Sequence, residues 1–319
     1  MNLLITGGSG FIGSNFVELA LGRIKTSPHI NKVVNLDALT YAGDISNTQN
    51  FAEHPKYYFE KVNIQNYDDV CGVFERHKIT HVVHLAAESH VDNSISGPDI
   101  FIDTNIVGTF NLLKAAQKYN IVRFHHVSTD EVYGELGATG EFSENSPYSP
   151  NNPYSASKAS SDFLVKSYYH TYKTPVTISN CSNNFGPKQH REKFIPTIIK
   201  SIANNQKIPV YGEGLNVRDW IYVKDHCEGI WAVLESGRLG ETYCIGANCE
   251  KTNIEVVNSI CEIIGVNPED WIEYVPDRQG HDYRYAINSN KIREELGWSA
   301  SHGYESAMEE TVRWYYERG

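Results

Sequence analysis

Short β-branched segments alternate with longer helical ones through the first half of the chain. Several of the short segments, such as Val82–Leu85, are dominated by apolar residues instead of alternating, which is typical of strands buried on both faces. Strands separated by helices indicate parallel pairing through crossover connections. The pattern therefore predicts an α/β fold with a doubly wound, Rossmann-type parallel sheet. The predicted strands are Asn2–Thr6, Lys32–Leu36, Tyr57–Asn63, His81–Ala86, Val122–Ser128 and Pro175–Asn180.

The segment Phe101–Lys118 is predicted to be one of these helices. Its apolar residues Ile102, Ile106, Phe110 and Leu113 fall close to one stripe of a helix. We expect this stripe to pack against another apolar surface.

After about Cys181 the regular alternation of strand and helix patterns gives way to segments rich in Gly, Pro and Asn. Shorter elements are predicted at Pro196–Ala203 and Asp219–Val223. Thr252 with Glu255 is predicted to form a capping box, and Asp225 with Glu228 a similar helix start. We predict a dinucleotide-binding domain over residues 1–180 and a second, smaller, mixed α/β substrate-binding lobe over 181–319. Some late segments are expected to return to the main sheet, so the boundary is not expected to be a flexible linker.

Charge and composition limit the classes of function that the protein can have. The 28 basic and 39 acidic side chains give a net charge of −11, which disfavours nucleic-acid binding by a general basic surface. No apolar stretch approaches the roughly 18 to 20 residues that span a bilayer, and no secretory leader is visible. The six cysteines are dispersed without a CxxC pair. We therefore expect a cytoplasmic protein with reduced thiols that binds neither nucleic acid nor membrane.

A glycine-rich turn, Gly7-Gly8-Ser9-Gly10-Phe11-Ile12-Gly13, follows the first strand and opens a helix. Small residues there let backbone amides and the helix N-terminus approach a pyrophosphate. Asp37 ends the next strand, where a carboxylate can accept hydrogen bonds from an adenosine ribose. That carboxylate would repel a 2′-phosphate. The sequence therefore predicts an NAD site.

Tyr154 and Lys158 lie four residues apart, on one face of a helix if Pro153 is in its first turn. A free tyrosine is ionised only about once in a thousand at pH 7. A nearby cation typically lowers a pKa by about 1 to 3 units, and oxidised nicotinamide adds a second positive charge. This pair is therefore predicted to be a general base acting on an alcohol.

The fifth predicted strand ends in Thr129-Asp130-Glu131. Polar residues at the carboxyl ends of parallel strands face the ligand crevice. Adjacent strand residues point to opposite faces, so both carboxyls can serve one substrate only if the backbone leaves strand geometry at Asp130.

Taken together, these motifs resemble the extended short-chain dehydrogenases/reductases, and more narrowly the dTDP-glucose 4,6-dehydratases, over essentially the whole chain. The Thr-Asp-Glu tripeptide is the feature that discriminates within this group, since related epimerases usually carry no such acid pair. Further matching segments are Leu36-Asp37 with Leu39–Gly43, Leu85–Asp92, Ser182–Asn184, Arg218–Trp220 and Asp277–Asp282. Departures from the family pattern fall at Ala38, Asn63, Asn93, Asn180, Phe185 and Gln279, and none is expected to touch the proton or hydride chemistry.

The resemblance implies a lyase that leaves NAD unchanged overall. Tyr154, aided by Thr129 and Lys158, would take the sugar 4-hydroxyl proton while NAD accepts the C4 hydride. Glu131 would remove the C5 proton as a protonated Asp130 gives its proton to the departing 6-hydroxyl, and the hydride would return to C6. The implied cofactor contacts are Gly7, Gly10, Phe11, Ile12, Gly13, Asp37, Thr40, Asn63, Ile64, Ala86, Tyr154 and Lys158.

The substrate's diphosphate requires positive charge, for which Arg218 and Arg278 are the best candidates because a guanidinium grips phosphate oxygens bidentately. An ion pair with Asp219 or Asp277 is the simpler alternative for each. The other predicted substrate contacts are Ser89, His90, Asp92, Asn183, Asn253 and His281.

Three functions remain open: a dTDP-glucose 4,6-dehydratase, a UDP-sugar 4,6-dehydratase or 4-epimerase, and a non-catalytic nucleotide-binding scaffold. His81 and His84 are predicted to lie on opposite strand faces, so no catalytic metal is expected. The resemblance also implies a homodimer that pairs through Phe101–Lys118 and Tyr154–Tyr172.

Overall fold

A computed structural model describes residues 1–27, 29–277 and 281–318. The chain forms a seven-stranded sheet in the order β10-β6-β5-β4-β1-β2-β3, and every neighbouring pair is parallel. The strand order reverses between β1 and β4, which places a ligand crevice at their carboxyl ends. The doubly wound sheet is thereby confirmed. Its strands are β1 (Asn2–Thr6), β2 (Lys32–Asp37), β3 (Tyr57–Lys61), β4 (His81–His84), β5 (Arg123–Thr129), β6 (Val176–Cys181) and β10 (Thr242–Ile245).

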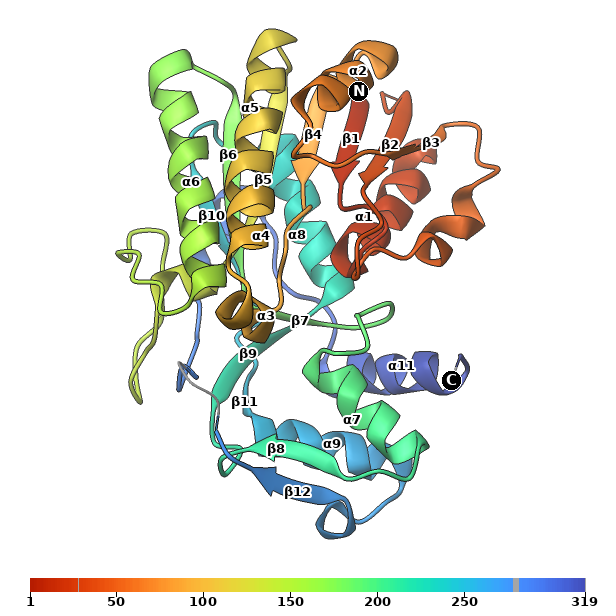
Figure 1. Cartoon of the computed structure of the whole chain (residues 1–319), viewed down its shortest axis with the longest axis vertical. Coiled ribbons are helices and arrows are strands. Elements are labelled where there is room, and N and C mark those ends of the chain that lie inside the picture. Colours follow the sequence, from red (N-terminus) through yellow and green to blue (C-terminus); the bar gives the residue numbers. More distant parts are fainter. Residues whose placement is uncertain (28, 278–280, 319) are drawn as a thin grey trace.

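Helices cover both faces of this sheet (Figure 1). Helices α1 (Phe11–Gly22) and α8 (Val223–Ser236) pack on one face, against strand residues that include Leu3 and Ile5. The opposite face, which includes Leu4, is covered by α2 (Tyr67–His77), α5 (Thr109–Lys118) and α6 (Pro153–Tyr172). Burial on both faces explains why the strands are continuously apolar.

The predicted strands agree with the structure to within about two residues, but the helix predicted at Phe101–Lys118 is interrupted. Helix α4 (Asp99–Phe101) leads into the π-helical segment η3 (Ile102–Gly108), and α5 follows. A π-helix changes the residues per turn, so the apolar stripe does not keep one direction. Leu113 is buried, whereas Ile102 and Phe110 are 46% and 39% exposed. The helix does pack on the apolar face of the sheet through Leu113 and its neighbours, but Ile102 and Phe110 are not part of that contact.

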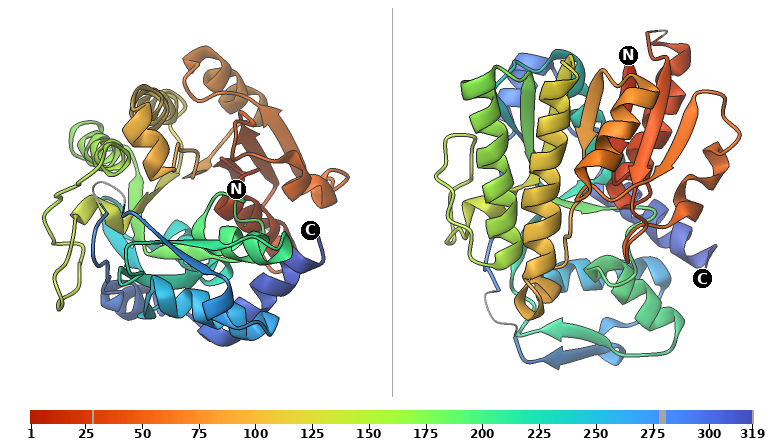
Figure 2. Two further views of the ribbon diagram at one scale, coloured as in Figure 1. Left: turned by 60° about the horizontal axis from the view of Figure 1, so that its bottom comes forward. Right: turned by 45° about the horizontal axis from the view of Figure 1, so that its top comes forward.

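A smaller mixed lobe lies beyond the carboxyl ends of the strands (Figures 1 and 2). It contains a three-stranded sheet, β11-β9-β7, in which β9 is antiparallel to β11 and parallel to β7, and a parallel pair, β12-β8. The lobe's elements are β7 (Asn183–Phe185), α7 (Phe194–Ala203), β8 (Ile208–Tyr211), β9 (Val217–Tyr222), β11 (Glu250–Thr252), α9 (Asn253–Ile264), η5 (Pro268–Asp270), β12 (Ile272–Val275) and α11 (Tyr304–Tyr316). Helix α10 (Asn290–Leu296) returns to pack on α8 and β10.

The remaining short elements connect the sheet strands. They are η1 (Arg23–Lys25), η2 (Ile45–Phe51), α3 (Val91–Ser96) and η4 (Asp130–Tyr133). The 1–180 and 181–319 division remains a prediction; the structure places the late strand β10 in the main sheet beside β6.

The two predicted helix starts had different outcomes. Thr252 and Glu255 form the predicted capping box at the start of α9. Asp225 does not cap α8, which begins at Val223 with Tyr222 as its N-cap. Its buried carboxylate instead accepts hydrogen bonds from Ser301 Oγ (2.9 Å) and His302 N (3.0 Å). The predicted capping role of Asp225 was wrong because its side chain binds residues of a distant segment of the chain.

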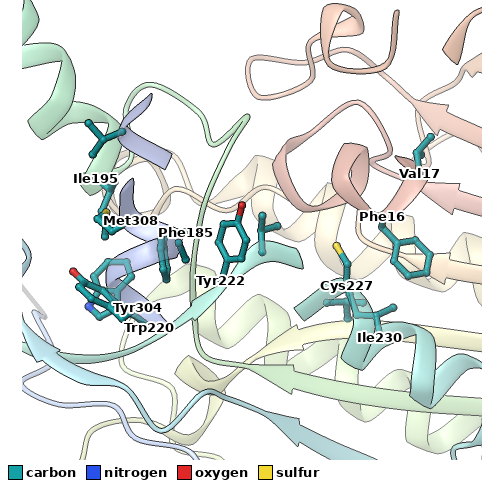
Figure 3. Packing of buried hydrophobic residues seen from close by; sticks show 14 of the residues in the cluster. Phe16, Val17, Phe185, Ile195, Trp220, Tyr222, Cys227, Ile230, Tyr304 and Met308 are labelled. Atoms are coloured by element: carbon teal, nitrogen blue, oxygen red, sulfur yellow. The ribbon is translucent and has the colours of Figure 1, made fainter. Parts of the chain in front are cut away.

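One hydrophobic cluster joins the lobe to the main sheet (Figure 3). Phe16 of α1 and Ile230 of α8 belong to the same buried cluster as Trp220, Phe185 and Met308 of the lobe. This continuous core packs the lobe directly against the helices of the main sheet. Among the described residues, no helix combines the length and the apolar character needed to cross a membrane.

Candidate active site

The glycine turn after β1 brings the backbone close to a second strand end. Gly7 has φ +71°, and a Cβ on it would lie 2.8 Å from the N and Cα atoms of Ala86. A Cβ on Gly13 would lie 2.0 Å from the carbonyl oxygen of Gly7. Gly10 is the N-cap of α1 and has no side-chain cap. The turn therefore requires glycine and presents bare backbone to the cavity, as a dinucleotide pyrophosphate requires.

Asp37 ends β2 beside this turn. Its Oδ2 accepts a hydrogen bond from Ser9 N (2.9 Å) and its Oδ1 one from Leu39 N (2.8 Å). Burial raises the pKa of Asp37, and these two backbone hydrogen bonds oppose that rise. The carboxyl is thus fixed at the rim of the cavity, where it can accept ribose hydroxyls.

A cavity of about 380 Å³ connects these features to the ends of β4, β5 and β6. Its walls contain every residue predicted to contact the cofactor and all five predicted to be catalytic. The first set is Gly7, Gly10, Phe11, Ile12, Gly13, Asp37, Thr40, Asn63, Ile64, Ala86, Tyr154 and Lys158, and the second adds Thr129, Asp130 and Glu131. The residues present fit a dinucleotide such as NAD.

Tyr154 and Lys158 are both buried on α6. Asn152 caps this helix by accepting a hydrogen bond from Ser155 N (2.9 Å), and Pro153 takes its first position as predicted. The Lys158 ammonium donates to the carbonyl oxygen of Val127 (2.9 Å), which anchors the helix to β5.

The pKa of Tyr154 does not follow the expectation from spacing. Burial raises it well above the ordinary value, the nearby Glu131 adds to the rise, and the Thr129 hydroxyl opposes it. Burial also lowers the pKa of Lys158. Desolvation therefore outweighs the expected effect of the lysine, and the protein's own residues keep Tyr154 protonated.

The acid pair lies where the backbone leaves β5. Thr129, the last strand residue, caps η4 by accepting a hydrogen bond from Glu131 N (3.3 Å). The condition set by the sequence is met, because a 3₁₀ turn starts at Asp130, and both Asp130 and Glu131 line the same cavity.

The two carboxyls have different surroundings. Asp130 is 2% exposed, and burial, Glu131 and Asp219 together raise its pKa well above the ordinary value. Glu131 is only partly buried, and its Oε2 accepts a hydrogen bond from Ser155 Oγ (3.4 Å). An enclosed carboxyl whose pKa is raised therefore lies next to one that is less buried.

A second cavity of about 290 Å³ lies against the lobe and shares several wall residues with the first, including Glu131, Asn183 and Lys193. Its walls contain all the predicted substrate contacts that the structure describes, namely Ser89, His90, Asp92, Asn183, Arg218, Asn253 and His281. Arg278 lies outside the described residues. Glu131 lines both cavities, and so stands where they meet.

Arg218 is held by backbone carbonyls. Its Nη1 donates to Val217 O (2.7 Å) and its Nη2 to Asp282 O (2.9 Å), with the guanidinium 4.5 Å from the centre of the Tyr285 ring. Asp219, the suggested ion-pair partner, accepts a hydrogen bond from Cys249 N (2.7 Å). These contacts fix the guanidinium at the wall of the second cavity.

Sequence reasoning missed two residues that matter here. Lys193 lines both cavities and donates to the carbonyl oxygen of Ser89 (2.7 Å), but no motif distinguishes it from other lysines. Asn180, noted from the sequence only as a departure from the family pattern, donates to the carbonyl oxygen of Thr129 (3.0 Å). It therefore supports the backbone that carries the acid pair, a contact that the sequence does not indicate.

No cluster of three or more potential metal ligands occurs in residues 1–27, 29–277 and 281–318. A glycine turn, an aspartate at the end of the second strand and a Tyr-Lys pair around the switch point of a parallel sheet define an extended short-chain dehydrogenase/reductase. The adjoining second cavity is suited to a nucleotide-linked substrate.

Comparisons with known proteins narrow this class. A family described as GDP-mannose 4,6 dehydratase matches residues 4–311. A dTDP-glucose 4,6-dehydratase of Xanthomonas campestris pv. campestris is 48% identical, over 98% of this chain and 92% of that protein. The solved structure of DesIV, a dTDP-glucose 4,6-dehydratase from Streptomyces venezuelae with NAD bound, superimposes with a TM-score of 0.95 at 42% identity and covers 99% of this chain and 97% of its own. The chain belongs to the dTDP-glucose 4,6-dehydratase family.

Proposed function

We propose that this protein dehydrates dTDP-glucose to dTDP-4-keto-6-deoxyglucose, with NAD restored in each turnover. The observation that carries the proposal is the meeting of Tyr154, Asp130 and Glu131 at one cavity that adjoins a second, arginine-containing one. The family supplies the substrate: relatives at 44–48% identity are dTDP-glucose 4,6-dehydratases.

The glycine turn and Asp37 are proposed to hold the NAD pyrophosphate and adenosine ribose. When bound, oxidised NAD would supply hydride-transfer chemistry to the sugar and a positive charge that favours the Tyr154 phenolate.

Tyr154 is proposed to take the proton from the sugar 4-hydroxyl. Burial keeps this phenol protonated in the protein alone, so its use as a base requires positive charge close by. The Lys158 ammonium provides part of that charge, and Thr129 provides a hydrogen bond.

Elimination of water is assigned to the acid pair. A 4-ketone acidifies the adjacent C5 proton, which Glu131 would remove. The same carboxyl would return a proton to C5 when the hydride is added at C6. The 6-hydroxyl must leave with a proton, and Asp130, whose pKa is held well above the ordinary value by burial and by Glu131, carries one at neutral pH. Two neighbouring carboxyls thus take opposite roles because one is enclosed and the other is not.

Arg218 is proposed to bind the diphosphate, together with the other residues of the second cavity. Its guanidinium is already oriented by backbone carbonyls, so little side-chain freedom is lost on binding. The net charge of −11 makes such a local cation necessary for a dianionic ligand.

A homodimer through α5 and α6 is part of the proposal. These helices pack side by side on one face of the sheet (Figure 1). Phe110 is 39% exposed there, and Phe163 and Tyr172 are 58% and 53% exposed. Six free cysteines fit a reducing compartment, which supports the cytoplasm as its location.

The test is incubation of the purified protein with dTDP-glucose, UDP-glucose and UDP-N-acetylglucosamine, followed by product masses. We expect loss of one water from dTDP-glucose. Loss of water only from a UDP-sugar would transfer the proposal to that substrate. Inversion at C4 without dehydration would instead indicate a 4-epimerase, and no reaction would indicate a binding scaffold.

The proposed dimer is tested by the mass of the protein in solution. A monomeric mass at micromolar concentration would contradict it.

A further inference from the structure

The segment 186–193, between β7 and α7, forms part of the wall of the first cavity, and we call it the strap. Figure 1 shows it between α1 and α11. The sequence implied no cofactor contact in this segment. The strap residues that line the cavity are Gln189, His190, Glu192 and Lys193.

Hydrogen bonds fix the strap to two helices. The carbonyl oxygen of Pro187 accepts a hydrogen bond from Asn15 Nδ2 of α1 (3.1 Å). The carbonyl oxygen of Gln189 accepts one from the hydroxyl of Tyr315 on α11. Lys193 ends the strap with its bond to the backbone after β4, described above. Because α1 begins within the glycine turn, the strap is attached to the same structure that is expected to hold the cofactor pyrophosphate.

A second segment, the loop 38–44 after β2, carries Tyr41 at the same cavity. This loop is also attached to the glycine turn, because Asp44 N and Asn47 Nδ2 both donate to the carbonyl oxygen of Ser9, at 3.1 and 3.0 Å. The side chain of Tyr41 lines the cavity and is 40% exposed. It is therefore a partly exposed aromatic group on a fixed loop.

The rings of Tyr41 and His190 meet, although they are far apart in the sequence. Their centroids lie 5.5 Å apart and their planes are at 85°, the edge-to-face arrangement that aromatic rings favour. Within the strap, Nδ1 of His190 lies 3.4 Å from Glu192 Oε1. The aromatic contact thereby joins the loop 38–44 directly to the strap.

This contact completes a closed ring of protein. The ring runs from the glycine turn through the loop 38–44 to Tyr41, across to His190, and along the strap to α1, which leads back to the turn. Every member of the ring contributes residues to the wall of the first cavity. The other links described here are covalent bonds or hydrogen bonds to backbone carbonyls. The contact between two partly exposed rings is therefore the link expected to open first.

We propose that the Tyr41–His190 contact is a closure that retains NAD in the first cavity. This inference rests on the NAD site of the proposed function and not on its substrate. Retention suits that function, because a reaction that restores NAD in each turnover has no need to exchange the cofactor. Release of NAD then requires the two rings to separate.

The expected effect follows from the strength of one ring contact. An edge-to-face pair changes an equilibrium by about 2-fold to 10-fold, so loss of either ring should speed NAD release by about that factor. Because the closure needs both rings, the double variant should release NAD no faster than the faster single variant. Two independent contacts with NAD would instead give effects that multiply.

The experiment loads the holoenzyme with radiolabelled NAD, adds a large excess of unlabelled NAD, and follows the label that stays on the protein. Tyr41→Ala, His190→Ala and the double variant are compared with wild type. We expect faster release from all three, with no further increase in the double variant. Unchanged release in both single variants would overturn the proposal, and so would effects that multiply in the double variant.

Two more variants separate the ring contact from other effects. Tyr41→Phe keeps the ring and should retain NAD as wild type does; release as fast as from Tyr41→Ala would overturn the proposal. Tyr58→Ala is the matched control, because Tyr58 is 41% exposed and its ring lies 5.3 Å from that of His77, yet it does not line the cavity. It should release NAD at the wild-type rate. Release as fast as from His190→Ala would overturn the assignment to the closure.

The release assay also separates this inference from the proposed dehydration. Variants that lose NAD faster, together with a wild type that holds NAD but forms no keto product, would support the closure and refute the dehydration. Formation of the keto product with unchanged NAD release in the variants would overturn the closure alone.

Discussion

Replacing Asp130 by Asn tests the division of labour between the two carboxyls. The amide has nearly the same shape but carries no acidic proton. Asp130 is 2% exposed, and its Oδ2 has no hydrogen-bond partner within the part of the chain that the structure describes. Solvent is therefore poorly placed to act as a substitute acid. We expect the loss typical of a general acid, about 100-fold to 10,000-fold in the elimination step, which corresponds to about 3 to 5 kcal/mol.

The assay separates oxidation from elimination. In a single turnover with dTDP-glucose, Asp130→Asn should still form NADH, which should accumulate because the next step is slow. Product containing the 4-ketone without the 6-hydroxyl should appear late. Dehydration within about tenfold of wild type would refute the role of Asp130, since general acids contribute more than that.

The same variant has a stability signature with a definite sign. Because the folded state holds the Asp130 proton above the pH at which the unfolded chain releases it, the wild-type free energy of unfolding falls as pH rises. For one such group the slope is about 1.4 kcal/mol per pH unit above about pH 4, until the folded carboxyl ionises. Asp130→Asn lacks this pH dependence. Measured by urea unfolding, its free energy of unfolding should therefore rise relative to that of wild type as the pH increases. A constant difference between the two proteins would contradict a protonated Asp130.

Three further outcomes are expected. Glu131→Gln should abolish exchange of the C5 proton with solvent and leave transient NADH formation intact; loss of both together would remove its role as the C5 base. Gly13→Ala should yield protein without bound NAD, because the new Cβ would lie 2.0 Å from the carbonyl oxygen of Gly7. The control Gly22→Ala lies in the same helix, where the new Cβ meets nothing within 4 Å, and it should keep its cofactor. Normal NAD content in Gly13→Ala would contradict the proposed role of the glycine turn. Arg218→Ala should raise KM for the nucleotide sugar by about 10-fold to 100-fold, the value of a charged hydrogen bond, with NAD occupancy unchanged; equal loss of NAD would show that the guanidinium supports the fold instead.

Local patterns were enough to predict the main sheet and the cofactor turn. A strand buried on both faces is continuously apolar, and a turn that meets another strand end requires glycine, so both leave a signal in a few adjacent residues. The sequence carries no such signal for β10, because Thr242–Ile245 is short and joins the sheet only through its pairing with β6.

The electrostatics of the site depend on neighbours that are distant in sequence. The spacing of Tyr154 and Lys158 indicated a lowered phenol pKa, yet burial among groups from several elements raises it. Residue types and spacing identified the proposed reacting groups, but their protonation states follow from packing.

The central claim is that the hydrogen removed from C4 of the sugar is the one delivered to C6. It is tested most directly by giving the enzyme dTDP-glucose deuterated at C4 and locating the label in the product by NMR. The account predicts deuterium in the C6 methyl group and a solvent-derived hydrogen at C5. Deuterium retained at C4, or released to solvent, would contradict it.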